Sequence, residues 1–289
     1  MIDYIEIKAP AKINFGLNVI SKREDGFHNL ETIFYPLKDL YDELRFTRSN
    51  KFEFTCSDKE LETDDNLIIR AKNLLENESK KKINVRIELQ KNIPLGAGLG
   101  GGSSDAAATL LSLNDMFGLK YDLDKLRSFA LQLGSDVPFF ISAKPAFAES
   151  RGEKLTLIDF EIPYPIVLVN PGIHISTAEA YKNIKSKPAM FNLKDLTNIK
   201  LTEPSDYITK VTNDFEDYAF NKHPEIEEIK EKLYSFGAKL SLMTGSGSTV
   251  FGIFNSFNEA EKAKVYFAEK YFAFINLPEE YDITLQTLN

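Results

Sequence analysis

The sequence predicts an α+β fold, with a β-rich first half and a second half that forms a separate layer of strands and helices. The first half contains several short runs in which apolar and polar residues alternate with a period of two, the pattern of half-buried strands. The second half has the order strand, loop, strand, helix, strand between residues 240 and 289. At 289 residues the chain is long enough for roughly two domains.

Composition excludes several classes of partner. The 43 acidic and 35 basic residues give a net charge of −8, which argues against general nucleic-acid binding. A single cysteine, Cys56, excludes an internal disulfide and suits a reducing compartment. No apolar run approaches the length of a membrane span, and the first residues lack the pattern of a signal peptide. We therefore expect a soluble, cytoplasmic protein with no nucleic-acid, membrane or obligate protein partner.

The N-terminal segment places a lysine and an asparagine on one strand face. Apolar residues alternate from Ile5 to Ala9, Pro10 is expected to end that strand, and a second alternating run covers residues 13–19. Period-two alternation puts Lys12 and Asn14 side by side. A lysine at the start of a strand is often an exposed charge that protects a sheet edge, so the position of Lys12 alone does not establish a ligand contact.

Further strands and turns follow in the first half. A turn at residues 24–26 precedes Phe27 and His28, which form either an ordinary packed pair or a pair that stacks on a base and contacts its edge. The elements expected next are strands at 31–37, 43–48 and 52–56, and a helix from a cap at 64–66 to about Glu78.

The most informative stretch is rich in glycine. Alternation from Ile83 to Leu89 predicts a strand, and Pro94 to Ala108 then reads P-L-G-A-G-L-G-G-G-S-S-D-A-A-A, with five glycines within the seven positions 96–102. The three-and-four spacing of apolar residues through Phe117 predicts a helix after it. The order is therefore strand, glycine loop, helix.

Such a loop is suited to binding phosphate. Glycine lets the backbone approach a ligand closely, and the first turn of a helix offers unpaired amides at the positive end of the helix dipole. Ser103 and Ser104 either cap the helix or donate to a phosphate, and their position does not separate these roles. The G-K-[ST] ending of the common P-loop is absent, and the dinucleotide-binding fingerprint fits poorly.

A carboxylate follows the next helix. This helix is expected over residues 124–133 and ends at Gly134, after which Asp136 precedes the apolar run Val137 to Phe140. Asp136 is either a turn or cap residue or a sheltered carboxylate that accepts a proton, and its local sequence alone favours the cap.

The second half contains a second, shorter glycine loop at Gly245 to Ser248, between two strands. Ser176 to Glu179 resembles a capping box that opens a helix carrying Tyr181. Residues 185–205 are polar without a clear period and are expected to form a loop or insertion. The other expected elements are a strand and turn at 146–153, a strand at 166–170, helices at 214–220, 225–236 and 258–271, and terminal strands.

Taken together, these motifs resemble those of the GHMP kinases. P-A-K-I-N near the N-terminus, the glycine-rich stretch after residue 93 and T-G-S-G-S near the C-terminus occur in the order found in that superfamily, and the resemblance covers essentially the whole chain. It implies a two-domain fold, with an ATP-binding domain at 1–160, a C-terminal domain at 161–289 and an active site in the cleft between them. It also implies phosphorylation of a small metabolite by ATP with Mg²⁺, whose protein ligands the resemblance does not assign.

Four further strings narrow the resemblance. A-K-I-N at 11–14, D-G-F-H at 25–28, L-G-S-D-V-P-F-F at 133–140 and N-P-G-I-H-I-S-T-A-E-A-Y at 170–181 are similar to those of members that phosphorylate the 2-hydroxyl of a cytidine diphosphate-linked methylerythritol, in the non-mevalonate route to isoprenoid precursors. The alternatives are another GHMP kinase, acting on mevalonate, homoserine or a sugar, and an inactive member that regulates a partner.

The resemblance also implies roles for individual residues. Lys12 and Asp136 would be the catalytic pair, Phe27 and Tyr181 would sandwich the cytosine, and His28 would contact its edge. Asn14 and Thr177 would be polar contacts near the substrate, and residues 245–248 would help to shape its pocket. The residues that would hold the ATP phosphates are Pro94, Leu95, Gly96, Ala97, Gly98, Leu99, Gly100, Gly101, Gly102, Ser103 and Ser104.

Two positions depart from the pattern of these members. Position 27 is often tyrosine, and Phe27 keeps the stacking face but lacks the hydroxyl. Position 135 is Ser where alanine is common, a small change that we expect to be harmless. Neither change removes a residue that the proposed chemistry needs.

Overall fold

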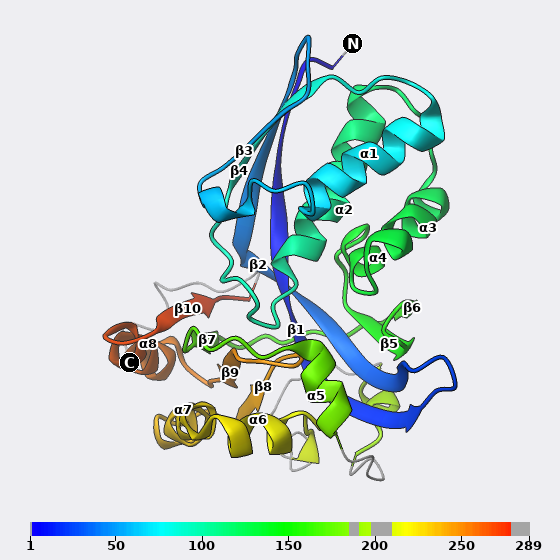
Figure 1. The fold of residues 1–289 in the computed structure, drawn as a ribbon. Helices are drawn as coiled ribbons and strands as arrows, with labels where there is room; N and C mark the ends of the chain where they lie inside the picture. The colour runs from blue at the N-terminus through cyan, green and yellow to red at the C-terminus, as the bar shows by residue number, and fades with distance from the viewer. Residues whose placement is uncertain (1, 185–190, 198–209, 279–289) are drawn as a thin grey trace. The chain divides into compact units, whose positions relative to one another are not determined.

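A computed structural model describes residues 2–184, 191–197 and 210–278. The chain forms two compact units that interleave along the sequence. Unit 1 comprises residues 1–12, 36–95 and 100–144, and unit 2 comprises residues 13–35, 96–99 and 145–289. The α+β composition predicted from the sequence is confirmed, with helices and sheets in both units (Figure 1).

Two long strands contribute to both units. β1 spans Tyr4–Lys22 and β2 spans His28–Arg48, and the two pair with each other. The prediction that Pro10 ends the first strand is therefore wrong, as is the prediction of two separate strands between residues 31 and 48. A strand tolerates proline where the missing N–H is not needed for pairing, and pairing with a long partner carries β1 through the interruption.

Unit 1 packs helices against a sheet. β4 (Val85–Gln90) pairs antiparallel with β2, from Glu43 opposite Gln90 to Arg48 opposite Val85, and parallel with β3 (Glu53–Cys56). Burial alternates strictly along β4, as its sequence predicts. The helices on one side of this sheet are α1 (Leu67–Ser79), α2 (Gly101–Met116), α3 (Leu123–Leu133) and α4 (Val137–Phe140) (Figure 1).

The longest helix of unit 1 is largely buried. α2 buries twelve of its sixteen residues, including Ala106, Ala107, Leu110 and Leu113. Small alanines let it pack closely against α1 and α4. The first turn of α2 is thereby held in a fixed position within the core of unit 1.

Unit 2 contains a second, antiparallel sheet. Its strand order is β10 (Phe272–Asn276), β7 (Ile166–Asn170), β9 (Val250–Ile253) and β8 (Leu240–Met243). The first part of β2 pairs with β5 (Ala146–Ser150), which pairs with β6 (Lys154–Leu157). The helices of unit 2 are α5 (Thr177–Asn183), α6 (Glu216–Lys222), α7 (Pro224–Ser235) and α8 (Phe257–Ala268).

Several short elements depart from the sequence-based prediction. α4 was not expected, and a short 3₁₀ helix at Leu193–Leu196 lies within the predicted loop, whose other residues mostly fall outside the described part of the chain. Any terminal strand after residue 278 also lies outside it. Among the described residues, none of the helices has the length and apolar character needed to cross a membrane.

Candidate active site

The glycine-rich loop ends in an open helix start. Gly100 is the N-cap residue of α2, has a left-handed backbone with φ 74°, and provides no side-chain cap. Ser103 and Ser104 are the third and fourth residues of the helix, so the alternative in which they cap it is wrong. Because the cap residue is glycine, no cap side chain occupies the first-turn amides, and such a helix start is suited to anion binding.

Gly100 is tightly surrounded. A Cβ atom at this position would lie 2.8 Å from Cζ of Phe140 and 3.2 Å from Cε of Lys12. Both the positive φ angle and the close neighbours therefore require glycine. This contact brings the start of α2 next to the proposed catalytic lysine.

Lys12 and Asp136 form an ion pair within unit 1. Nζ of Lys12 lies 3.5 Å from Oδ2 of Asp136, and the side chains are 3% and 37% exposed, respectively. The interpretation of Lys12 as an exposed edge charge is therefore wrong. Burial lowers the pKa of Lys12, and the charge of Asp136 partly opposes this effect.

Asp136 does not act as a helix cap. It occupies the N-cap position of α4, but its side chain makes no capping hydrogen bond. The following residues Val137, Phe139 and Phe140 are buried, as the apolar run predicts. Of the two roles left open by the sequence, the geometry favours the sheltered carboxylate.

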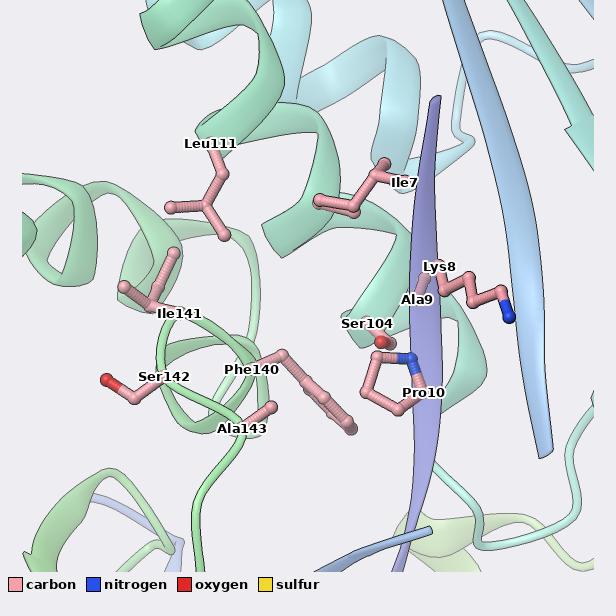
Figure 2. Close-up of a pocket in the computed structure, with 11 residues that line it drawn as sticks. Ile7, Lys8, Ala9, Pro10, Ser104, Leu111, Phe140, Ile141, Ser142 and Ala143 are labelled. Carbon is pink, nitrogen blue, oxygen red and sulfur yellow. The ribbon is translucent and has the colours of Figure 1, made fainter. Parts of the chain in front are cut away.

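A cavity of about 270 Å³ lies beside the start of α2. Figure 2 shows the ring of Phe140 directed toward Pro10, with the Ser104 side chain nearby. The hydroxyl oxygen of Ser104 is buried and has no hydrogen-bond partner within the part of the chain that the structure describes. The walls are formed by Ile7, Lys8, Ala9, Pro10, Ser104, Ala108, Leu111, Phe140, Ile141, Ser142 and Ala143.

These features fit a bound nucleoside triphosphate. The uncapped first turn offers amide donors, and Ser104 carries a hydroxyl with no hydrogen-bond partner among the described residues. Among the described residues, no group of three or more His, Cys, Asp or Glu side chains is arranged to hold a metal ion. Protein-bound Mg²⁺ commonly has few protein ligands and keeps water and phosphate oxygens in its shell.

In unit 2, the first part of the glycine loop packs on the second glycine loop. A Cβ atom on Gly98 would lie 2.3 Å from the carbonyl oxygen of Thr244, and the backbone N–H of Thr249 donates to the carbonyl of Ala97 over 3.3 Å. A Cβ atom on Gly245 would lie 3.3 Å from the carbonyl oxygen of Gly98. The glycines of both loops are thus needed for backbone-to-backbone contact.

Asn14 belongs to a buried network that supports this contact. Its backbone N–H donates to Oγ1 of Thr244 over 2.8 Å, and its side-chain amide donates to Oγ1 of Thr32 over 3.0 Å. The Thr32 hydroxyl donates to the carbonyl of Gly16 over 2.6 Å. Asn14 therefore anchors the second glycine loop, and sequence reasoning missed Thr244, although it opens the string T-G-S-G-S.

The proposed base-binding residues make two separate ring contacts within unit 2. The ring of His28 stacks on that of Tyr181, with centroids 5.0 Å apart and planes 17° apart, and Tyr181 meets the ring of Phe215 edge-on. Phe27 is 51% exposed, and the guanidinium carbon of Arg151 lies 4.6 Å from its ring centroid. Burial lowers the pKa of His28, and the charge of Lys22 adds a smaller effect.

Arg151 was missed by sequence reasoning. Its backbone N–H donates to Oε2 of Glu153, and it follows Ser150 in the turn between β5 and β6. Arg23 donates to the Ser150 hydroxyl over 2.9 Å and to both carboxylate oxygens of Asp25. The segment that carries Phe27 is therefore held by two arginines that no short motif identifies.

Thr177 contacts the second glycine loop. Its hydroxyl lies 2.9 Å from the hydroxyl of Ser246. Ser176 is the N-cap residue of α5 and accepts from the backbone N–H of Glu179, as the capping-box string predicts. His174, which sequence reasoning passed over, lies against the first glycine loop, since a Cβ atom on Gly96 would be 2.7 Å from its Nδ1.

Two family models match the chain. The model described as "GHMP kinases N terminal domain" matches residues 66–144, and that described as "GHMP kinases C terminal" matches residues 193–273. The first range contains the whole glycine-rich loop, the helix that follows it, and Asp136.

Curated relatives share sequence over most of the chain. The chain is 42% identical over 264 residues to a protein of Prosthecochloris aestuarii, covering 90% of this chain and 92% of the relative. It is 44% identical over 252 residues to a protein of Bacteroides fragilis, covering 85% and 90%, respectively. Both relatives are named 4-diphosphocytidyl-2-C-methyl-D-erythritol kinase.

Solved structures share the fold. A crystal structure of 4-(cytidine 5'-diphospho)-2C-methyl-D-erythritol kinase is similar with a TM-score of 0.80 and 34% identity, covering 94% of this chain and 98% of that one. A crystal structure of mevalonate kinase has a TM-score of 0.74 at 15% identity, covering 94% and 98%, respectively, and shows a likeness of fold alone. The chain therefore belongs to the GHMP kinases and, within them, to the 4-diphosphocytidyl-2-C-methyl-D-erythritol kinase family.

Proposed function

We propose that the protein is an ATP-dependent small-molecule kinase that phosphorylates the 2-hydroxyl of 4-diphosphocytidyl-2-C-methyl-D-erythritol in the synthesis of isoprenoid precursors. The observation that carries this proposal is the ion pair of Lys12 and Asp136 next to Gly100, at the uncapped start of α2. It combines a carboxylate, a fixed cation and phosphate-binding amides within unit 1. Membership of the 4-diphosphocytidyl-2-C-methyl-D-erythritol kinase family supports the choice of this cytidyl compound as the phosphoryl acceptor.

The glycine loop would hold the triphosphate. Residues 94–104 provide backbone amides and the positive end of the α2 dipole, which together stabilise anionic oxygens. When bound, ATP supplies the phosphoryl group, and Mg²⁺ neutralises charge on the phosphate oxygens. The Ser104 hydroxyl, which has no partner among the residues that the structure describes, would donate to a phosphate oxygen.

Asp136 would accept the proton of the substrate hydroxyl. The 2-hydroxyl is a tertiary alcohol and a hindered nucleophile, so positioning and proton removal both matter. Asp136 is partly exposed and can meet a ligand, whereas buried Lys12 keeps the carboxylate in place. The ammonium group would also stabilise negative charge that develops on the oxygen or the phosphoryl group.

The aromatic residues of unit 2 would bind the cytosine. The exposed face of Phe27 and the ring of Tyr181 offer stacking surfaces, and the neighbouring His28 would contact the base edge. Thr177 would contribute a polar contact near the substrate. Asn14 would act by holding Thr244 and the second glycine loop, which would help to shape the pocket.

The domain bounds, the cellular compartment and the partners follow from the proposed kinase function. We assign an ATP-binding family domain to residues 1–160 and a second family domain to residues 161–289. We also infer that the protein works in the cytoplasm on a small molecule, without an obligate protein partner.

Product identification tests the proposed function. The purified protein would be incubated with Mg-ATP and the cytidyl substrate, and the product examined by ³¹P NMR and mass spectrometry. We expect one new phosphomonoester on the tertiary 2-hydroxyl, with the diphosphate bridge intact. Phosphorylation of mevalonate, homoserine or a sugar, without phosphorylation of the cytidyl compound, would instead identify another GHMP kinase activity.

A further inference from the structure

Three buried charged side chains cluster next to α2 in unit 1, and the proposed reaction does not use them. They are Asp42 of β2, Lys91 after β4, and Asp105 of α2, with side-chain exposures of 0%, 7% and 4%. Lys91 forms an ion pair with Asp42, and its Nζ lies 3.4 Å from Oδ2 of Asp105. Buried charges are costly to the fold unless they are well paired, and a hydrophobic replacement often serves stability equally well. Stability alone therefore gives little reason for this cluster.

The cluster contacts the backbone on both sides of the glycine-rich loop. Oδ1 of Asp42 accepts from the backbone N–H groups of Asn92, over 2.6 Å, and Ile93, over 2.9 Å. These are the two residues directly before the loop. After the loop, Nζ of Lys91 lies against Gly101, where a Cβ atom would be 2.8 Å from it. The cluster thus ties the entry of the loop to the first residue of α2.

Its charge balance matters for an anionic ligand. If both carboxylates were ionised, the cluster would carry a net charge of −1 close to the amides that would hold phosphate. Burial raises the pKa of Asp105 to about 8; Asp42 adds to this rise, and Lys91 opposes it. Oδ1 of Asp105 has no hydrogen-bond partner among residues 2–184, 191–197 and 210–278. The raised pKa favours the protonated form of Asp105 near neutral pH, which reduces the negative charge beside the loop.

The Cys56 thiol also interacts electrostatically with the cluster. Burial raises its pKa, with smaller effects from Asp105 and Lys91. It therefore stays neutral while Asp105 titrates.

We propose that Asp42, Lys91 and Asp105 form a positioning cluster that fixes the phosphate loop for ATP and keeps negative charge away from it. The inference rests on the proposed function, because it requires that this loop binds ATP. Asp42 and Lys91 fix the positions of the residues directly before the loop and of the first residue of α2. Asp105 makes this support dependent on pH.

Nucleotide binding measured by calorimetry tests the cluster independently of turnover. ATP would be titrated into the full chain at pH 7 and pH 9, with Asp105→Asn as the test variant and Asp115→Asn as the control. Asp115 is on the same helix but exposed. Ionisation of Asp105 adds one negative charge near the phosphates, so the dissociation constant of the wild type for ATP should rise between pH 7 and pH 9. We expect this rise to exceed that of Asp105→Asn by roughly fivefold to tenfold. Asp115→Asn should behave like the wild type, and at pH 7 Asp105→Asn should bind ATP within about twofold of it.

A second variant tests the positioning role at constant pH. Lys91→Met keeps most of the side-chain volume but removes the charge that joins the two carboxylates. We expect it to weaken ATP binding at pH 7 by roughly tenfold or more, and to change the affinity for the cytidyl substrate by less than about twofold. If Lys91→Met does not fold, as judged by circular dichroism, Asp105→Asn still decides the question.

The outcomes separate the inference from the proposed function. If Asp105→Asn follows the wild-type pH dependence, or if Lys91→Met weakens both ligands equally, the cluster has only a structural role and the inference is overturned. If the wild type binds no ATP at either pH, the proposed function itself fails, and the inference fails with it.

Discussion

Lys12 and Asp136 form an ion pair in which only the acid reaches solvent. Nζ of Lys12 lies 3.5 Å from Oδ2 of Asp136, with side-chain exposures of 3% for the lysine and 37% for the aspartate. The buried ammonium group is fixed by its surroundings, while the carboxylate keeps one side open. This asymmetry suits a carboxylate that contacts a substrate hydroxyl and a cation that holds it in place.

Asp136→Asn should abolish most turnover without preventing binding. The amide keeps the shape of the side chain but cannot accept a proton from the hydroxyl. General acid–base catalysis contributes about 10²–10⁴-fold, so we expect kcat to fall by a factor in that range. Steady-state kinetics, with ATP affinity measured separately by calorimetry, would check this. A variant with near wild-type kcat and intact binding would show that Asp136 only orients the hydroxyl or has no catalytic role.

Gly100→Ala should damage the phosphate loop far more than Gly102→Ala. At position 100 the added methyl would meet Phe140 at 2.8 Å in a left-handed backbone, whereas at position 102 its nearest neighbour is Cδ1 of Leu67 at 3.9 Å. We expect Gly100→Ala to raise the KM for ATP at least about tenfold, because strain of about 1–3 kcal/mol would displace the first turn of α2. Gly102→Ala adds the same methyl group without a close neighbour, so this matched control should raise the KM for ATP much less than Gly100→Ala does. Equal kinetics for the two variants would contradict the packing described for Gly100.

Parts of this site follow from sequence and parts do not. The strand, glycine loop and helix follow from local periodicity, and Asn66 caps α1 as predicted. The sequence left open whether Ser103 and Ser104 cap α2, because an N-cap is usually a polar side chain, whereas in the structure Gly100 holds the cap position in a left-handed backbone. The ion pair of Lys12 with Asp136 joins residues that lie far apart in the chain, so no local pattern could reveal it.

Phe27→Ala should mainly weaken binding of the cytidyl substrate. The ring offers an exposed stacking face, and loss of base stacking costs about 1–3 kcal/mol. We expect a higher KM for the cytidyl compound, with kcat changed much less and the KM for ATP unchanged. Phe27→Tyr preserves the ring and serves as the control. An equal fall in kcat at unchanged KM would exclude a role limited to binding.

Glu216 of α6 is a pH-sensitive support for β8, the strand that precedes the second glycine loop. Glu216 accepts from the backbone N–H of Met243 over 2.9 Å and pairs with Lys230 over 2.7 Å, and burial raises the pKa of Glu216 despite the opposing effect of Lys230. Between the ordinary glutamate pKa of 4.5 and this raised value, the folded state binds more protons than the unfolded state. The contribution of Glu216 to stability therefore falls as pH rises through that window.

Glu216→Gln should remove this contribution. The amide oxygen can still accept from Met243, so the backbone contact survives. Urea unfolding from pH 4.5 upward should show the free energy of unfolding of the wild type decreasing relative to that of the variant as pH rises. A constant difference across that range would mean that Glu216 does not titrate there.

The aromatic residues proposed to bind the cytosine show a second limit of sequence-based prediction. D-G-F-H marks Phe27 and His28 through resemblance, but the contacts of Arg151 with Phe27 and of His28 with Tyr181 are long-range. Side chains that meet through packing of separate strands and helices leave no local spacing in the sequence. Thr244 is similar, because its role depends on a hydrogen bond from Asn14, 230 positions away.

Release of ADP with two acceptors tests the central claim most directly. The protein would be incubated with Mg-ATP and either the cytidyl-diphospho-methylerythritol or the same molecule lacking CMP. Rapid ADP release with the cytidyl compound alone would support both the kinase chemistry and recognition of the cytosine. No release with either acceptor, from protein that still binds ATP, would contradict the proposed function while leaving the fold and the phosphate loop intact.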